Sequence, residues 1–313
     1  MTPQTHGRGA GRSRLMEEIE KVLRRRLGWD EYQMSSKMWE YVGVYVGVLI
    51  AYGIDPHAWI EVFHSLTVND TYMLGAVHGD VYVRPTSPSW YEVSATTSST
   101  IGVLYFERLI RIIKTPGIDI SMRRREGGRI PNMIYVKFYV LLRKGEWPWY
   151  GKGYETISSF NTSELLSYLA GLIDTDGSVR VVVEPPRKPM FMIDITSANI
   201  EFLKYLRDVV YERLGIKGHV AADKRPGSGG RLRFECSQAV QLYEELRRYL
   251  AHPMRKLRAE VYLRYHNKEL TIKEFEHLYE PLKYDDNGNN DPKRNHAVDA
   301  LTQAAPQTHT HGG

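Results

Sequence analysis

The segment LAGLIDTDG, residues 169–177, begins like a helix of a protein interior and ends with two aspartates and a glycine. Its aliphatic and small residues belong to the types most often found fully buried. A helix C-terminus already carries partial negative charge from its unpaired carbonyl groups, so a carboxylate such as Asp176 is unfavourable there. A positive group should therefore lie next to it.

The same pattern occurs earlier in the chain. Aligning residues 72–83 (YMLGAVHGDVYV) with residues 168–179 (YLAGLIDTDGSV) places Asp80 on Asp176, an offset of 176 − 80 = 96 residues. Around each segment the sequence predicts a helix, two strands, a helix and two strands. A period this long indicates a tandem duplication rather than a solenoid, whose repeats are shorter.

Small residues form one stripe on each of the two helices. Gly75 and Gly79 lie on the first stripe and Gly171 on the second. Such stripes let two helix backbones approach closely, so we expect these three glycines to pack helix against helix. If the helices are parallel, Asp80 and Asp176 face each other at the C-terminal ends.

Two carboxylates so close repel each other, and one pKa rises unless a cation lies between them. Mg²⁺ takes one or two carboxylates together with waters and substrate phosphates. We therefore predict that Asp80 and Asp176 bind Mg²⁺, or Mn²⁺, and act in catalysis. An ordinary helix C-cap is the usual interpretation of one isolated Asp-Gly, but the recurrence of the acid in both halves favours a site.

These residues resemble the LAGLIDADG homing endonucleases, in the single-chain, two-motif form of archaeal intron-encoded members. The motif at residues 169–177 differs from the name-giving pattern only by Thr175 in place of alanine. The motif at residues 73–81 keeps the final acid, Asp80, but has His78 where the family has aspartate. A packed or capping role is expected for His78 rather than metal binding.

By this resemblance the chain is α+β, with two tandem pseudo-symmetric αββαββα repeats that form a DNA-binding saddle. The expected parts are an N-terminal helical extension (1–66), the first repeat (67–160), the second repeat (161–266), and a C-terminal helix with a disordered tail (267–313). Three consecutive arginines at 24–26 would lengthen the DNA footprint, unless the extension is only a packing cap on the first repeat.

Family members cut both strands of a long asymmetric DNA site, and each final motif acid binds a metal at one scissile phosphate. The resemblance therefore implies a monomeric, site-specific endonuclease that hydrolyses phosphodiester bonds. It also implies a basic residue near the acids. Lys256, or its neighbour Arg255, resembles the place where some members carry a catalytic lysine, and we assign the role to Lys256. A helix-surface cation is the alternative.

Basic residues lie in or beside the predicted strands of both halves. Arg231 and Arg233 alternate with Leu232 and Phe234, which predicts one cationic and one apolar face of a sheet. Such a face neutralises phosphates and places arginine against guanine edges. The predicted DNA-binding residues are Arg123, Arg125, Lys137, Arg180, Lys224, Arg231 and Arg233.

Composition agrees with these expectations without establishing them. The 42 Lys and Arg exceed the 37 Asp and Glu, which gives a net charge of +5 and a pI of about 9.0. Cys236 is the single cysteine, so an internal disulfide is excluded. The most apolar run, residues 41–53, is shorter than the roughly 18 residues of a membrane span. We expect a cytoplasmic protein without a membrane partner.

A protein that binds without cutting is the alternative on the same scaffold. It would be an RNA maturase acting on intron RNA, or a DNA-binding regulator. Loss of a motif acid would favour this alternative, but Asp80 and Asp176 are both present.

Overall fold

The computed structural model describes residues 68–97, 105–106, 109, 113, 119–124, 134–146, 151, 153–184, 187–223 and 229–283. The predicted N-terminal extension and the tail from residue 284 lie outside these ranges. The described part is α+β with antiparallel sheets, as the sequence predicted.

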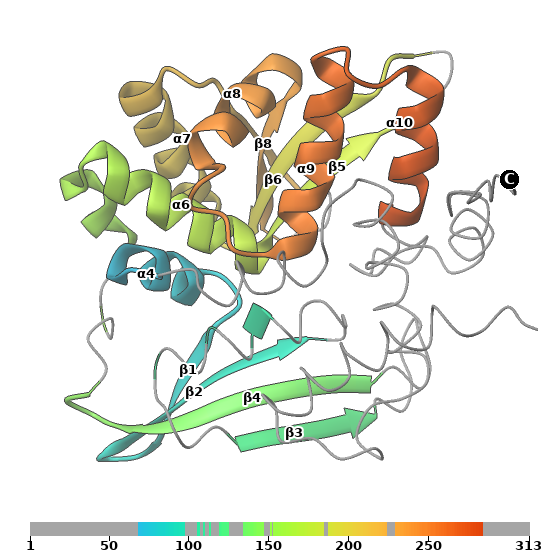
Figure 1. Ribbon diagram of the computed structural model, residues 1–313. Coiled ribbons are helices and arrows are strands. Elements are labelled where there is room, and N and C mark those ends of the chain that lie inside the picture. Colours follow the sequence, from blue (N-terminus) through green and yellow to red (C-terminus); the bar gives the residue numbers. More distant parts are fainter. Residues whose placement is uncertain are drawn as a thin grey trace, which may run out of the picture.

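Two four-stranded sheets have the same strand order (Figure 1). The first sheet has the order β1-β2-β4-β3 and the second β5-β6-β8-β7, with every neighbouring pair antiparallel. This agreement is what a duplicated unit predicts. The strands are β1 (Tyr82–Ser87), β2 (Trp90–Thr97), β3 (Asp119–Arg124), β4 (Ile134–Arg143), β5 (Gly177–Val182), β6 (Met190–Ser197), β7 (His219–Ala222) and β8 (Gly230–Glu235).

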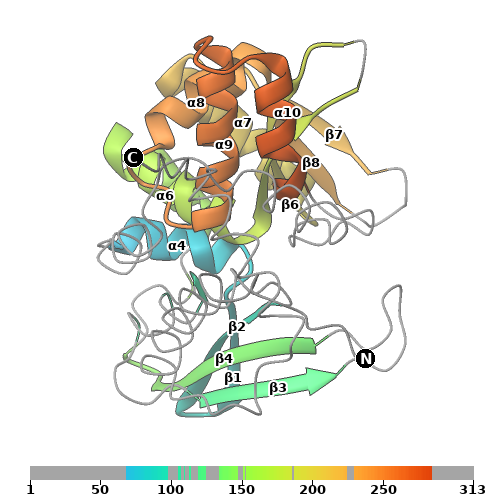
Figure 2. The same ribbon diagram turned by 45° about the vertical axis from the view of Figure 1, so that its right-hand side comes forward.

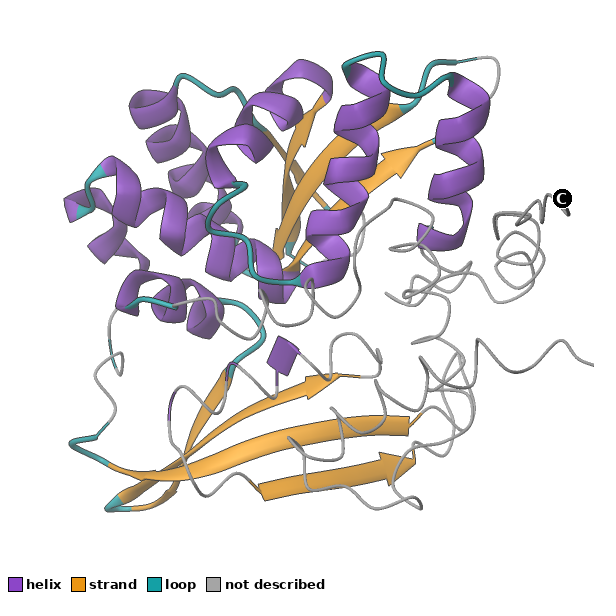
Figure 3. Ribbon diagram, in the orientation of Figure 1, coloured by secondary structure: helices purple, strands orange, loops and turns teal. Residues whose placement is uncertain are grey.

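Two helices, α4 (Asp70–His78) and α6 (Thr162–Asp176), lie side by side between the two sheets (Figures 1 and 2). In the second half, helices pack on one face of the sheet (Figure 3). Between β2 and β3 of the first half, the described residues 105, 106, 109 and 113 are helical. The remaining elements are η1 (Tyr154–Ser159), α7 (Ile200–Leu214), α8 (Cys236–Leu246), α9 (Pro253–His266), α10 (Ile272–Tyr279) and η2 (Glu280–Leu282).

The start of α6 is fixed by a capping box. The Asn161 side chain accepts a hydrogen bond from the Glu164 N–H at 3.0 Å, and the Glu164 carboxylate accepts one from the Asn161 N–H at 2.8 Å. Asn161 therefore occupies the N-cap position, and Thr162 is the first residue of the helix. Most of α6, from Leu165 to Thr175, is buried because it packs against α4, α8 and the second sheet.

The strands of the second sheet alternate between two environments. Leu232 and Phe234 are fully buried, whereas Arg231 and Arg233 point to the opposite face of β8. The predicted division into one apolar and one cationic face is therefore confirmed for this strand. The apolar face and the buried helices belong to one hydrophobic core that contains residues of both halves.

The end of α10 is hydrogen-bonded to the outer edge of β5. The Val181 N–H donates a hydrogen bond to the Tyr279 hydroxyl at 2.6 Å. The buried Arg258 of α9 donates from Nε to the Leu282 carbonyl, also at 2.6 Å, and so holds the end of the described chain against α9. None of the helices in the described ranges is long and apolar enough to span a membrane.

Candidate active site and nucleic-acid interface

Glycines set the distance between α4 and α6. A Cβ atom on Gly75 would lie 2.0 Å from the Tyr168 carbonyl oxygen, and a Cβ atom on Gly171 would lie 2.0 Å from the Tyr72 carbonyl oxygen. Real Cβ atoms do not approach backbone this closely, so only glycine fits at both positions. Gly79 is similar, since its Cβ would lie 2.1 Å from Thr175 Oγ1.

Two hydrogen bonds cross between the helices in the same way. The Tyr72 hydroxyl donates to Asp174 Oδ2 at 2.7 Å, and the Tyr168 hydroxyl bonds His78 Nδ1 at 2.8 Å. The alignment of the two motifs places Tyr72 on Tyr168 and His78 on Asp174. The two hydrogen bonds thus join positions that the alignment of the two motifs makes equivalent. His78 also packs edge-on against the Tyr168 ring.

The two final motif acids lie at the C-terminal ends of this helix pair. Asp176 is the last residue of α6, and Asp80 follows Gly79, the C-cap of α4. A Cβ on Gly79 would lie only 3.3 Å from the Cβ of Asp176, so the two chain segments meet there. The structure therefore brings Asp80 and Asp176 together.

The pKa values of both acids are raised, and for Asp176 the nearby Asp80 contributes to the rise. Burial, and then the negative charge of Asp80, raises the pKa of Asp176 to about 6, while a hydrogen bond from Thr196 and the charge of Arg255 oppose the rise. Asp80 keeps contact with solvent, yet partial loss of water raises its pKa too, again against the charge of Arg255.

Arg255, near the start of α9, is the positive group that the helix end requires. Its side chain is buried, and its Nη2 donates to the Thr175 carbonyl at 3.1 Å. Its Nε and Nη1 have no hydrogen-bond partner in the part of the chain that the structure describes. Arg255 therefore balances negative charge at the end of α6 and retains two unused donors.

Lys256, which the sequence favoured for the catalytic role, lies in a different electrostatic setting. Burial lowers the pKa of Lys256, and the charges of Glu260 and Asp174 partly restore it. Arg255, rather than Lys256, acts on the pKa values of both Asp80 and Asp176. The catalytic role of Lys256 stays a prediction.

Asp174 is a fully buried carboxylate that sequence reasoning missed. Its Oδ2 accepts hydrogen bonds from the backbone N–H groups of Ala251 at 2.5 Å and His252 at 3.0 Å, besides that from Tyr72. Burial raises its pKa to about 6, against the charge of Arg255 and these hydrogen bonds. Asp174 therefore connects α6 to the segment between α8 and α9.

The donor set around Asp80 and Asp176 fits a magnesium ion better than a metal that needs a full protein cage. Within the described residues no group of three or more His, Cys, Asp and Glu is arranged to hold a metal. Two carboxylates that repel each other can hold a hard divalent ion whose remaining ligands are water and phosphate oxygens.

The cationic sheet faces are both built around a carboxylate. In the second sheet Asp194 lies among Arg180, Arg231 and Arg233. In the first sheet Glu92 accepts from Lys137 at 2.5 Å and pairs with Arg84 at 2.9 Å. The sequence identified most of these cations but neither acid. The side chain of Arg123, on β3, and the residues Arg125 and Lys224 lie outside what the structure describes.

Residues 163–252 match a family model described as the LAGLIDADG-like domain. This part of the chain is therefore similar to LAGLIDADG-like domains. It contains α6 with Asp174 and Asp176, and it ends before Arg255. Among curated proteins, none matches the chain.

Solved structures similar to this chain include the homing endonuclease I-WcaI bound to its DNA recognition sequence, with a TM-score of 0.46 and 10% identity over 68% of this chain and 97% of that one. Another is the I-SmaMI LAGLIDADG homing endonuclease bound to cleaved DNA (TM-score 0.43, 14% identity, 68% and 95% covered). A third is the N-terminal LAGLIDADG domain of DUF199/WhiA (TM-score 0.40, 11% identity, 60% and 88% covered).

Proposed function

We propose that this protein is a site-specific DNA endonuclease that makes double-strand breaks by divalent-metal-dependent phosphodiester hydrolysis. The observation that carries the proposal is the meeting of Asp80 and Asp176 at the ends of α4 and α6, where the charge of one raises the pKa of the other. Closely packed glycines fix this arrangement, and the unfavourable repulsion is a reason to expect a cation there.

Each group in the site has a role in this reaction. A bound Mg²⁺ or Mn²⁺ supplies an activated water and stabilises the negative charge that develops on the phosphate. Asp80 and Asp176, when ionised, are the residues that would hold it. The buried Arg255 would act through its charge, which lowers the pKa of both acids and so favours the ionised carboxylates that a metal ion needs. Lys256 remains the predicted second cation.

The two cationic sheet faces are proposed to bind double-stranded DNA. Lys137 in the first sheet and Arg180, Arg231 and Arg233 in the second belong to the predicted DNA-binding set. Two halves that differ in sequence suit a long asymmetric target, and one chain containing both would act as a monomer. Intron RNA is a further possible ligand of the same faces.

Cleavage of a randomised plasmid library tests the proposal. Wild type, Asp80→Asn and Asp176→Asn would be incubated with supercoiled DNA and Mg²⁺, and both the cut ends and the bound DNA would be sequenced. We expect wild type to cut one long motif, and each variant to nick or to lose cutting while still binding. Equal cutting by all three proteins would contradict the assignment of the acids.

A binding-only protein, either a DNA-binding regulator or an RNA maturase, is the second candidate. One observation favours it, because Arg255 already supplies part of the positive charge that Asp80 and Asp176 require. Selective recovery of one DNA motif without any cut ends would support the regulator. Binding of structured intron RNA in preference to DNA would support the maturase.

A further inference from the structure

Asp194 is a buried acid in the middle of a sheet face that carries three arginines. Its side chain is only 4% exposed, although the β6 face that carries it is not covered by the helices of the core. An acid facing DNA repels phosphates, and a buried carboxylate is costly unless it is paired. Its presence here therefore calls for a reason.

The pairing of Asp194 is extensive. Arg233 binds it with two nitrogens, Nε to Oδ1 at 2.6 Å and Nη2 to Oδ2 at 3.3 Å. Arg180 Nη2 lies 3.1 Å from Oδ2, and Arg231 Nη1 lies 4.0 Å from the same oxygen. These arginines come from β5 and β8, the two strands that flank β6. One carboxylate thus fixes side chains across three strands.

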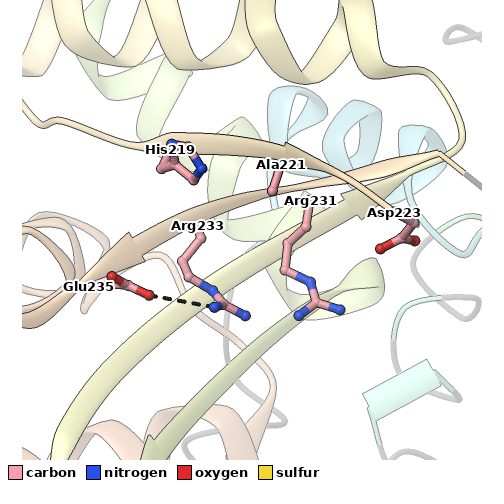
Figure 4. Close-up of a pocket in the computed structure, with 6 residues that line it drawn as sticks. All are labelled: His219, Ala221, Asp223, Arg231, Arg233 and Glu235. Carbon is pink, nitrogen blue, oxygen red and sulfur yellow. Dashed lines mark hydrogen bonds and ion pairs between the residues drawn. The ribbon is translucent and has the colours of Figure 1, made fainter.

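The arginines nevertheless keep donors for another ligand. Each guanidinium has five N–H groups, of which Asp194 uses one or two. The side chains of Arg180, Arg231 and Arg233 are 26–38% exposed, whereas Asp194 is not. Figure 4 shows Arg231 and Arg233 side by side, with their guanidinium groups directed the same way along a pocket. The buried carboxylate therefore holds the three arginine side chains while they remain partly exposed to solvent.

We propose that Asp194 is a positioning residue that fixes Arg180, Arg231 and Arg233 as an array selective for guanine in the DNA major groove. The inference rests on the proposed DNA binding. A guanidinium held in one orientation can form the bidentate contact to guanine O6 and N7, while a freely rotating one binds phosphates with little selectivity. Immobilising the side chains before DNA arrives also lowers the entropy lost on binding.

In the first sheet a carboxylate also holds cations, but it fixes their orientation less strictly. Glu92, also on the second strand of its sheet, holds Arg84 and Lys137, but lysine lacks the planar fork of arginine. The two faces should therefore differ in their preference for bases. The half-site under β5–β8 is expected to be rich in guanine, and the half-site under the first sheet less so.

Base selection by the Asp194→Asn variant tests the proposal. DNA bound in EDTA from a randomised duplex library would be sequenced, and affinities would be measured for the enriched duplex and for a base-permuted one. We expect Asp194→Asn to reduce discrimination between the two duplexes by about tenfold or more. Affinity for the permuted duplex should hold or rise, because a negative charge has been removed.

Glu235→Gln is the matched control. Glu235 lines the same pocket and lies 3.5 Å from Arg233 Nη1, but its side chain is 46% exposed. The Glu235→Gln substitution removes the same charge from the same surface. It should leave the discrimination between the two duplexes within about twofold of wild type. Equal loss of discrimination in both variants would reduce the effect to net charge and overturn the proposal.

Two further outcomes complete the test. If Asp194→Asn folds and keeps wild-type base preferences, the inference is wrong. If it does not fold, as judged by circular dichroism, Asp194→Glu replaces it. That variant keeps the charge and the salt dependence but displaces the carboxylate, so unchanged discrimination would again overturn the inference. If the wild-type protein showed no sequence preference, the proposed sequence-specific DNA binding itself would be wrong.

Discussion

The C-terminal parts of α4 and α6 occupy equivalent positions in the two halves but use different chemistry. In one crossed pair, Tyr72 of α4 bonds the buried carboxylate Asp174 of α6. In the other, Tyr168 of α6 bonds the half-buried imidazole of His78. The tyrosine is the same in both halves, and only its partner has changed. The comparison indicates that each tyrosine hydroxyl needs a polar partner on the neighbouring helix. The carboxylate of Asp174 has a second task besides this one.

That second task is the attachment of a neighbouring segment. Asp174 also accepts from the backbone N–H groups of Ala251 and His252, just ahead of α9. Since α9 carries Arg255, the same carboxylate contributes to placing the cation beside the two motif acids. The His78 half has an imidazole instead, so we expect the two halves to differ in how much stability each pair contributes.

The glycine contacts are expected to have the largest effect, because they affect both halves at once. Gly75→Ala or Gly171→Ala places a Cβ 2.0 Å from a backbone carbonyl oxygen that cannot move without separating the helices. Each should lower the free energy of unfolding by about 3 kcal/mol or more, as measured by urea denaturation. Gly145→Ala is the control, because nothing lies within 4 Å of its Cβ position. If only one of the two alanine substitutions lowered the free energy of unfolding strongly, the two glycine contacts would not be equivalent.

The second largest effects on stability are expected from replacing Asp174 and His78, the hydrogen-bond partners of the two tyrosines. Asp174→Ala leaves two backbone N–H groups without an acceptor and removes one hydrogen bond of the Tyr72 hydroxyl, which should cost about 3 kcal/mol. His78→Ala removes the hydrogen bond with Tyr168 and the ring contacts with Tyr168 and Phe202, and should cost about 1 kcal/mol. Thermal unfolding of both variants at equal concentration would measure the difference. Similar losses would contradict the second task assigned to Asp174.

Removing the tyrosine hydroxyls sharpens the same comparison with a smaller change. Tyr72→Phe loses a hydrogen bond to a carboxylate and one with Tyr105, which should cost about 2 kcal/mol. Tyr168→Phe loses a hydrogen bond to a histidine and should cost about 1 kcal/mol. A double variant of Tyr72→Phe with Asp174→Asn should be less than additive, because the two residues are in contact. Full additivity would mean that their hydrogen bond contributes nothing.

The smallest expected change is a gain in stability, which follows from removing the charge of Asp176. The pKa of Asp176 is raised to about 6 in the folded protein, above its value in the unfolded chain. The folded state then binds more protons than the unfolded state between roughly pH 4 and pH 6, so the free energy of unfolding falls as the pH rises through that window. At pH 7, Asp176→Asn should stabilise the protein by about 1 kcal/mol, after allowance for partial exposure to solvent.

Urea denaturation of wild type and Asp176→Asn at pH 4 and pH 7 measures this effect. The two proteins should be nearly equal at pH 4 and differ at pH 7. The proposed cleavage should decline as the pH falls through about 6, because a protonated carboxyl does not hold a metal ion. Destabilisation by Asp176→Asn at pH 7 would mean that the carboxylate has a favourable partner other than those described.

Much of the fold followed from local patterns. Strand alternation predicted β8 because Arg231 and Arg233 alternate with apolar residues, and helix α7 ends at Gly215 in the left-handed conformation, as a terminal glycine predicts. The pairing of Asp80 with Asp176 followed from the internal repeat. These features depend on residues close in sequence or on the duplication itself.

Other features depend on spatial arrangement that no local pattern contains. Asp194 holds Arg180 and Arg233 only because β6 lies between β5 and β8, an order that the sequence does not state. The choice between Arg255 and Lys256 was similar. Adjacent helix residues point about 100° apart, so the side of α9 that faces the acids decides which cation acts on them. The resemblance to the homing endonucleases assigned the role to Lys256, and that role stays a prediction.

The hydrogen bond from Val181 to Tyr279 has a consequence for synthesis of the chain. The two residues are 98 positions apart, so β5 emerges from the ribosome well before the residue that covers its edge. At ordinary translation rates that interval is roughly 5 to 20 seconds. During this time the strand can pair with a strand of another nascent chain. Chains that stop before α10 are therefore expected to aggregate through β5, and Tyr279 protects the finished protein from the same fate.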